Sequence, residues 1–196
     1  MRLFTLLALL ILSSIFVSAQ STVSRHEDTA QMEVTLAYSA DRTNQAPGSC
    51  GCFWMQGGKA EANMYYGRGV SVVAELTGLH ASNISAAHQS LSFVTYLFGP
   101  RFTPWRSRRI NPFAQFLFGG VHGFDAYFPS ATGQTLNPDA LAFAAGGGMN
   151  WKLSRHFAWR VFQADYLYTQ LPNAGDDTQN HLRLAAGVVF RFPSGK

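Results

Sequence analysis

The sequence contains eight segments in which apolar and polar side chains alternate with a period of two. This period places successive side chains on opposite faces of a β-strand, so each segment predicts a strand with one apolar face. Arg160 departs from the pattern, because it falls on the apolar face of its segment and therefore requires an interface position or a β-bulge. The predicted strands are 31–40, 58–66, 70–80, 90–102, 111–124, 140–153, 157–170 and 181–192.

The connections between these segments alternate in length. The short or moderate ones are 67–69, 104–110 and 153–156. The longer ones, rich in Asn, Gly, Pro, Ser and Asp, are 41–56, 81–89, 125–139 and 171–180. Short turns at one end and long loops at the other are typical of outer-membrane β-barrels, whose short turns face the periplasm.

The polar face of the strands distinguishes a membrane barrel from a soluble one. A water-facing sheet carries many long Lys and Glu side chains, whereas this face is mostly Gly, Ala, Ser and Thr, and only 13% of all residues are charged. Small side chains fit the narrow interior of an eight-stranded barrel, and aromatic residues near the ends of the apolar face fit the membrane interfaces. We therefore expect an all-β fold, an eight-stranded antiparallel up-and-down transmembrane β-barrel over residues 31–192, rather than a soluble secreted barrel.

The N-terminus has the pattern of a secretory signal peptide. A positive start precedes an apolar run over residues 3–17, which is about 15 residues long and shorter than the roughly 20 that a membrane-spanning helix needs. Small residues then lead to a cleavage site after Ala19. We expect residues 1–19 to be a cleaved signal, 20–30 a short N-terminal segment and 193–196 a C-terminal tail.

Several stretches of the chain resemble one family of membrane proteins, namely 98–101, 111–113, 146–148, 160–166 and the closing segment 182–192. With them, the mature chain resembles the small eight-stranded outer-membrane β-barrels, of the kind formed by the OmpA transmembrane domain, the OmpX/Ail-type proteins and the barrel-domain proteins of acidobacterial type. The resemblance implies a monomer in the outer membrane of a Gram-negative bacterium, surrounded by outer-membrane lipids. Phe192 and the alternating residues before it resemble the signal that the barrel-assembly machinery reads, which implies that machinery as a partner during biogenesis.

Charged side chains on the small-residue face would point into the lumen of this barrel. Unpaired charges in a narrow and poorly hydrated space are costly, so most of them should pair or reach interfacial water. We expect a salt-bridged plug that leaves little room for an aqueous channel; the alternative is a selective pore lined by charge. The candidates are Glu33, Lys59, Glu61, Glu75, Arg101, Lys152, Asp165, Arg183 and Arg191.

Cys50 and Cys52 lie in the first long connection, which would face the oxidising exterior. An exported pair can form a disulfide there, although the very small ring would be strained and easily reduced. Free or redox-active thiols are a second interpretation. A metal site is a third, but two thiols without a neighbouring His are too few for structural zinc.

His80 and Ser82, followed by Asn83, resemble the His-x-Ser-Asn of the outer-membrane lipid A deacylases, which are also eight-stranded barrels. Such chemistry needs a Ser nucleophile, a His base and a carboxylate that orients the His. In that family the acid lies a short way downstream, whereas here the next acidic residue after Ser82 is Asp125, in another connection. We therefore interpret the motif as a polar cluster and expect no enzyme; a lipid A-modifying barrel is the alternative.

The remaining features limit the function without naming it. The composition, 47% hydrophobic with a formal net charge of +4, excludes a highly charged nucleic-acid binder, and we expect neither a nucleic-acid partner nor a cofactor. Arg106, Arg108 and Arg109 cluster in a turn that would face the periplasm, either as a solvated turn or in contact with anionic lipid headgroups or cell-wall material. We expect a structural or surface-interaction role through the outer loops, with an unidentified extracellular ligand, because binding residues concentrate in loops. A small solute pore is the alternative.

Overall fold

The computed structural model describes residues 30–44, 52–67, 69–82, 90–124, 128–130, 133–135, 138–172 and 177–193. Within these ranges the chain forms ten β-strands. No helix in the described part is long and apolar enough to cross a membrane. The predicted signal peptide lies outside the described residues.

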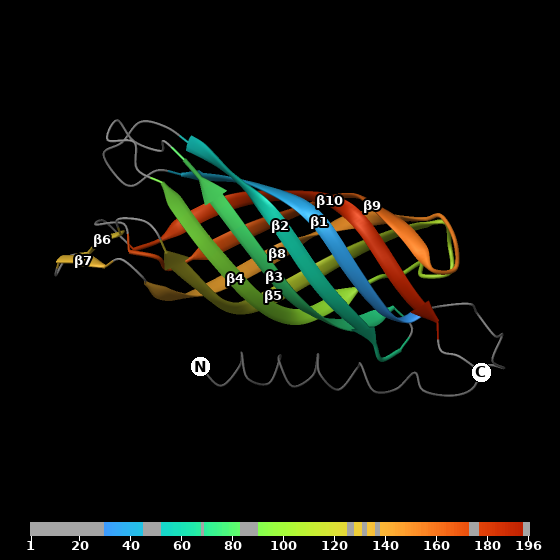
Figure 1. Ribbon diagram of the computed structural model, residues 1–196. Helices are drawn as coiled ribbons and strands as arrows, with labels where there is room; N and C mark the ends of the chain where they lie inside the picture. Colours follow the sequence, from blue (N-terminus) through green and yellow to red (C-terminus); the bar gives the residue numbers. More distant parts are fainter. Residues whose placement is uncertain are drawn as a thin grey trace, which may run out of the picture.

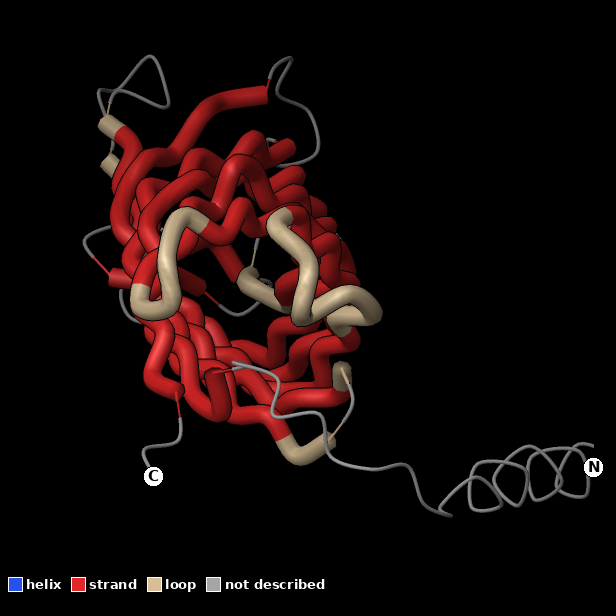
Figure 2. The backbone as a smooth tube through the Cα atoms, turned by 90° about the vertical axis from the view of Figure 1, so that its right-hand side faces the viewer, coloured by secondary structure: helices blue, strands red, loops and turns tan. Residues whose placement is uncertain are grey.

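Eight of the strands close into one antiparallel barrel (Figure 1). The order around the barrel is β1, β10, β9, β8, β5, β4, β3, β2, so that β1 and β10, from the two ends of the chain, close the ring that Figure 2 shows from its end. This confirms the predicted fold class. The barrel strands are β1 (Ala30–Asn44), β2 (Cys52–Tyr65), β3 (Val70–Ala81), β4 (Leu91–Phe102), β5 (Ile110–Phe124), β8 (Asp139–Lys152), β9 (Phe157–Thr169) and β10 (Gln179–Pro193).

The two ends of the barrel differ, as the connection lengths predicted. At the short-turn end the strands are joined by residues 66–69, 103–109 and 153–156. At the long-loop end the connections are 45–51, 82–90, 125–138 and 170–178. The third of these contains a hairpin that the sequence did not predict, formed by β6 (Phe128–Ser130) and β7 (Gly133–Thr135), which projects from the left end of the barrel in Figure 1.

The first long connection is shorter than the predicted loop 41–56, because β1 continues to Asn44 and β2 begins at Cys52. The polar residues of this stretch had indicated a loop. They instead continue the alternation of β1, with Asp41 and Thr43 buried inside the barrel and Arg42 exposed. Polar residues that face a barrel interior therefore resemble the residues of a turn in composition, and here they led to the prediction of a loop.

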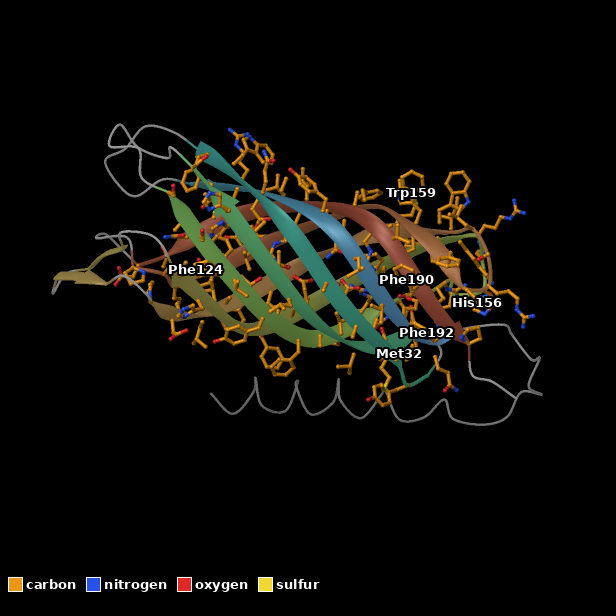
Figure 3. The ribbon with its side chains drawn as sticks, in the orientation of Figure 1. Met32, Phe124, His156, Trp159, Phe190 and Phe192 are labelled. Atoms are coloured by element: carbon orange, nitrogen blue, oxygen red, sulfur yellow. The ribbon has the colours of Figure 1, made fainter. Side chains whose placement is uncertain are left out.

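The exterior of the barrel is apolar. β3 alternates between exposed and buried side chains along most of its length, and the outward positions of the other strands carry large hydrophobic residues, such as Leu36 at 53%, Tyr96 at 50% and Phe116 at 50% exposure. Figure 3 labels Phe124 at the long-loop end and Trp159 and Phe192 toward the short-turn end. An outward-facing apolar band with aromatic residues toward both ends is the lipid-facing surface of a transmembrane barrel.

A β-bulge in β9 explains the irregular position of Arg160. Arg160 pairs with Asn150 of β8, but the next pair in the ladder is Phe162 with Met149, so Val161 is an extra residue. Val161 and Phe162 both face outward, while Arg160 and Gln163 on either side of them are buried. The bulge therefore lets the inward positions of β9 on both sides of it, such as Arg160 and Gln163, face the lumen.

Hydrophobic side chains fill part of the interior. Phe93, Leu117 and Leu167 belong to a buried cluster that reaches the long-loop ends of the strands at Leu91 and Leu171. The rest of the interior is occupied by polar and charged side chains.

Candidate functional site: the charged interior

The structure buries ten charged side chains inside the barrel, and they come from six of its eight strands. Within the described ranges, five are acids and five are bases, so their formal charges cancel. A buried charge is tolerated only when it is paired and hydrogen-bonded. The ten residues, here named the lumen network, are Glu33, Asp41, Lys59, Glu61, Glu75, Arg101, Arg160, Asp165, Arg183 and Arg191.

Glu61 of β2 is held by two arginines that reach it from β4 and β9. Arg101 Nη1 donates to Glu61 Oε1 at 2.6 Å, and Arg160 Nη1 donates to Glu61 Oε2 at 2.8 Å. Both guanidinium groups also lie over the ring of Phe113, at 4.2 and 4.8 Å from its centroid. The carboxylate therefore ties together three strands through charge-assisted hydrogen bonds, with an aromatic face covering its partners.

Lys59 of β2 lies among three carboxylates. Its Nζ is 2.7 Å from Glu75 Oε2, 3.6 Å from Asp165 Oδ2 and 3.9 Å from Glu61 Oε2. Asp165 in turn accepts a hydrogen bond of 3.1 Å from Gln115 Nε2. The single ammonium thus offsets repulsion among acids that come from β2, β3 and β9.

Arg183 of β10 pairs with two carboxylates of the lumen network, those of Asp41 and Glu75. Its Nε is 3.0 Å from Asp41 Oδ2, and its Nη1 donates to Glu75 Oε1 at 2.8 Å. Thr95 Oγ1 accepts a further bond from Nη2 at 3.3 Å. These contacts join β10 to the neighbouring strand β1 and, across the lumen, to β3 and β4.

Glu33 and Arg191 form a separate pair near the ends of β1 and β10. Arg191 Nε lies 3.0 Å from Glu33 Oε1, and Tyr65 Oη donates to Glu33 Oε2 at 3.1 Å. The two charged residues are directly opposite each other in the β1–β10 ladder. This pair therefore ties together the two strands that close the barrel.

The structure brings eight of the nine lumen candidates into ion pairs. The exception is Lys152, the last residue of β8, which is partly exposed and has no acidic partner in the part of the chain that the structure describes. Sequence reasoning left out two members of the network, Asp41 and Arg160. Asp41 could have been found by extending the alternation of β1 past residue 40, and Arg160 by taking its irregular phase as a bulge.

His80 and Ser82 do not form a pair in the structure. His80 Nδ1 lies 2.8 Å from Ser92 Oγ, on the residue opposite it in the β3–β4 ladder. Both His80 and Ser82 are exposed. Over the described ranges no carboxylate contacts His80, so the third member of a hydrolytic triad is not assembled there.

The cysteine pair cannot be placed in the same way. Cys50 lies outside the described residues, and so does the side chain of Cys52. Among the side chains that are described, no three His, Cys, Asp or Glu residues are grouped so that they could hold a metal ion.

Comparison with known proteins gives a result for the structure and none for the sequence. No protein-family model matches the chain, and no curated protein matches it. Among solved structures, Neisserial surface protein A is similar with a TM-score of 0.62 and 11% identity, covering 84% of this chain and 99% of that one. Ail, the attachment invasion locus protein of Yersinia pestis, has a TM-score of 0.57 and 17% identity over 84% and 99% of the two chains. OprG, an outer membrane protein of Pseudomonas aeruginosa, has a TM-score of 0.52 and 8% identity over 85% and 97%.

The chain has the fold of the small eight-stranded outer-membrane β-barrels. This fold and the apolar exterior agree with the predicted location in the outer membrane of a Gram-negative bacterium. In an outer-membrane barrel, short turns lie on the periplasmic side and long loops outside the cell. The short-turn end of this barrel corresponds to the periplasmic side under that rule.

Proposed function

We propose that this protein is a closed, non-conducting outer-membrane barrel that acts through its surface and its outer loops. The observation that carries the proposal is the filled lumen. Arg101, Arg160 and Arg183, which are large side chains, are all at most 1% exposed and engaged by acids from other strands. An eight-stranded barrel has room for side chains in its interior but little room for water beside them.

Purified protein reconstituted into planar bilayers is expected to give no stable conductance. Each ion that entered the lumen would have to displace paired charges that are held by several hydrogen bonds. Insertion is verified in the same preparation by the different gel mobility of heated and unheated barrel. Large and reproducible open channels from folded protein would show that the lumen conducts, and would favour the pore alternative.

With the lumen filled, the outer connections are the candidate surface for an interaction role. Their charge restricts the kind of partner that they can bind. Connections 45–51, 82–90, 125–138 and 170–178 contain Asp125, Asp176 and Asp177 but no Lys or Arg. Ail was solved in complex with a heparin analogue, sucrose octasulfate. A polyanion of that kind does not suit loops with a net negative charge, so we do not carry this ligand over to the present chain.

We also propose that the barrel is not a lipid A-modifying enzyme. The support is the contact of His80 with Ser92 rather than Ser82, without a carboxylate to orient the imidazole. Overexpression of the wild type is expected to leave the lipid A profile unchanged in mass spectrometry, and a Ser82→Ala variant is expected to match it. Loss of an acyl chain with the wild type, but not with Ser82→Ala, would contradict this proposal.

A further inference from the structure

The two ends of the barrel carry opposite charge. The short turns 66–69, 103–109 and 153–156 contain five arginines and no acidic residue, whereas the long connections contain three aspartates and neither Lys nor Arg. Lys152 adds a further positive charge next to the last short turn. Four of these arginines together with Lys152, here named the basic rim, form the positive group at this end: Arg106, Arg108, Arg109, Lys152 and Arg155.

Backbone hydrogen bonds hold three members of the basic rim on one sector of the barrel. Lys152 N donates to Arg109 O at 2.7 Å, which joins the turn between β4 and β5 to the end of β8. Leu153 N donates to Phe157 O at 3.0 Å and closes the β8–β9 turn that carries Arg155. Arg109, Lys152 and Arg155 therefore lie at the neighbouring ends of the adjacent strands β5, β8 and β9.

A row of large apolar side chains lies on the exterior directly beside these charges. Trp151 pairs with Ile110 of β5 and with Trp159 of β9, so the three residues are consecutive across the sheet. They are 51%, 53% and 55% exposed in that order. Trp105, in the turn itself, is also exposed. Tryptophan is enriched where lipid tails meet headgroups, so this row marks the depth of the headgroup layer.

Two of the arginines are oriented by aromatic rings. The guanidinium carbon of Arg106 lies 3.5 Å from the centroid of the Tyr65 ring, and its Nη1 donates to Gly67 O at 3.0 Å. That of Arg108 lies 5.1 Å from the centroid of the Trp105 ring. Desolvation by partial burial lowers the pKa of Arg106, but a guanidinium stays charged in proteins. Arg106 therefore lies at the mouth of the barrel beside the β2–β3 turn, whereas Arg108 lies beside the exposed Trp105.

We propose that the basic rim binds anionic phospholipid headgroups in the inner, periplasmic leaflet of the outer membrane. The inference rests on the proposed insertion in that membrane and adds a lipid class and a binding surface to it. Arginine donates bidentate hydrogen bonds to phosphate oxygens, and lysine adds a point charge. Several such residues at the bilayer surface attract anionic lipid, and the adjacent tryptophans anchor the same sector among the acyl chains.

The test uses the tryptophans as reporters. Three of the four tryptophans of the chain, at 105, 151 and 159, lie beside the basic rim, and a Trp54→Phe variant leaves only these. This variant is reconstituted into phosphatidylcholine vesicles with brominated phosphatidylglycerol or, at equal mole fraction, brominated phosphatidylcholine. The quantity measured is the quenching of tryptophan fluorescence by each brominated lipid. We expect phosphatidylglycerol to be enriched about fivefold at these tryptophans, the factor that corresponds to one Lys or Arg near an anionic surface.

The matched variant replaces Arg108, Arg109, Lys152 and Arg155 by Gln, and we expect it to quench equally with both lipids. The control is Arg42→Gln, which removes an exposed base at the long-loop end and is expected to keep the preference. The proposal is overturned if both lipids quench the tryptophan fluorescence equally when the basic rim is intact. It is also overturned if the fourfold variant keeps the preference for phosphatidylglycerol. No quenching by either lipid would mean that the barrel is not inserted, which is a failure of the proposed location.

Other phosphate sources and other partners give different results. If inorganic phosphate at constant ionic strength abolishes the preference, the rim is a site for free phosphate and the lipid proposal is wrong. If the fourfold variant loses binding to purified cell-wall sacculi while neither lipid is preferred, the partner is the cell wall and the lipid proposal is equally wrong.

Discussion

Replacing Glu61 by Gln is expected to lower the free energy of unfolding by about 3–5 kcal/mol, the usual cost of removing one partner of a buried ion pair. The substitution keeps the shape of the side chain and removes its charge. Arg101 and Arg160, which donate to Glu61 at 2.6 and 2.8 Å, would then be left with an uncompensated positive charge in the lumen. Urea-induced unfolding in lipid vesicles, followed by tryptophan fluorescence, measures the change.

A double variant separates the loss of charge from the loss of packing. Glu61→Gln combined with Arg101→Met restores a neutral lumen, so it is expected to recover part of the stability, and the cycle of single and double variants gives the coupling between the two residues. Arg42→Gln, at an exposed position, serves as the control and should change stability by at most about 0.5 kcal/mol. A loss below about 1 kcal/mol for Glu61→Gln would show that water enters the network and screens it.

Gly187→Val is expected to prevent closure of the barrel or to cost about 3 kcal/mol or more, the upper end of what overpacking costs. Gly187 of β10 lies opposite Ala37 of β1, in the ladder that closes the ring. A Cβ at this position would overlap the Leu36 carbonyl oxygen and would lie 2.7 Å from Ala37 Cβ. The first of these atoms belongs to the backbone, so the collision is relieved only by separating the two strands. Retention of the compact form on an unheated gel, together with β-sheet circular dichroism, measures folding.

Gly58→Val is the matched control for this substitution. Gly58 also lies within a barrel strand, but a Cβ built there meets no atom within 4 Å. Because Gly58 is exposed and valine favours strands, we expect this variant to fold as well as the wild type. Equal folding of the two variants would show that β1 and β10 approach less closely than the structure has them, and would falsify the prediction.

The strand pattern could be predicted from the sequence because it is a local property. Alternation fixes which side chains face lipid and which face the lumen, since a strand places successive residues on opposite sides. The alternating loop lengths then favoured a barrel with two different ends. Where the local signals conflict, the prediction is wrong or incomplete: the polar residues around Asp41 predict a loop, whereas Asp41 and Thr43 lie inside the barrel.

The inward direction of Lys59, Glu61 and Arg183 was likewise a local inference, and these residues were predicted to be charges in the lumen. Their partners could not be predicted. Glu61 and Arg160 are 99 residues apart in sequence, and Asp41 and Arg183 are 142 apart.

Local alternation is therefore enough to predict that eight strands form, which face of each meets the membrane, and that charges lie in a narrow interior. The folded barrel determines which acid meets which base, because some pairs, such as Glu61 and Arg160, cross the lumen and others, such as Asp41 and Arg183, join the two strands that meet only when the ring closes. It also decided that Arg160 belongs inside, since the bulge at Val161 is defined by the ladders on both sides of β9. Periodicity along one strand carries no information about the strand on the far side of a barrel, and only closure brings the two together.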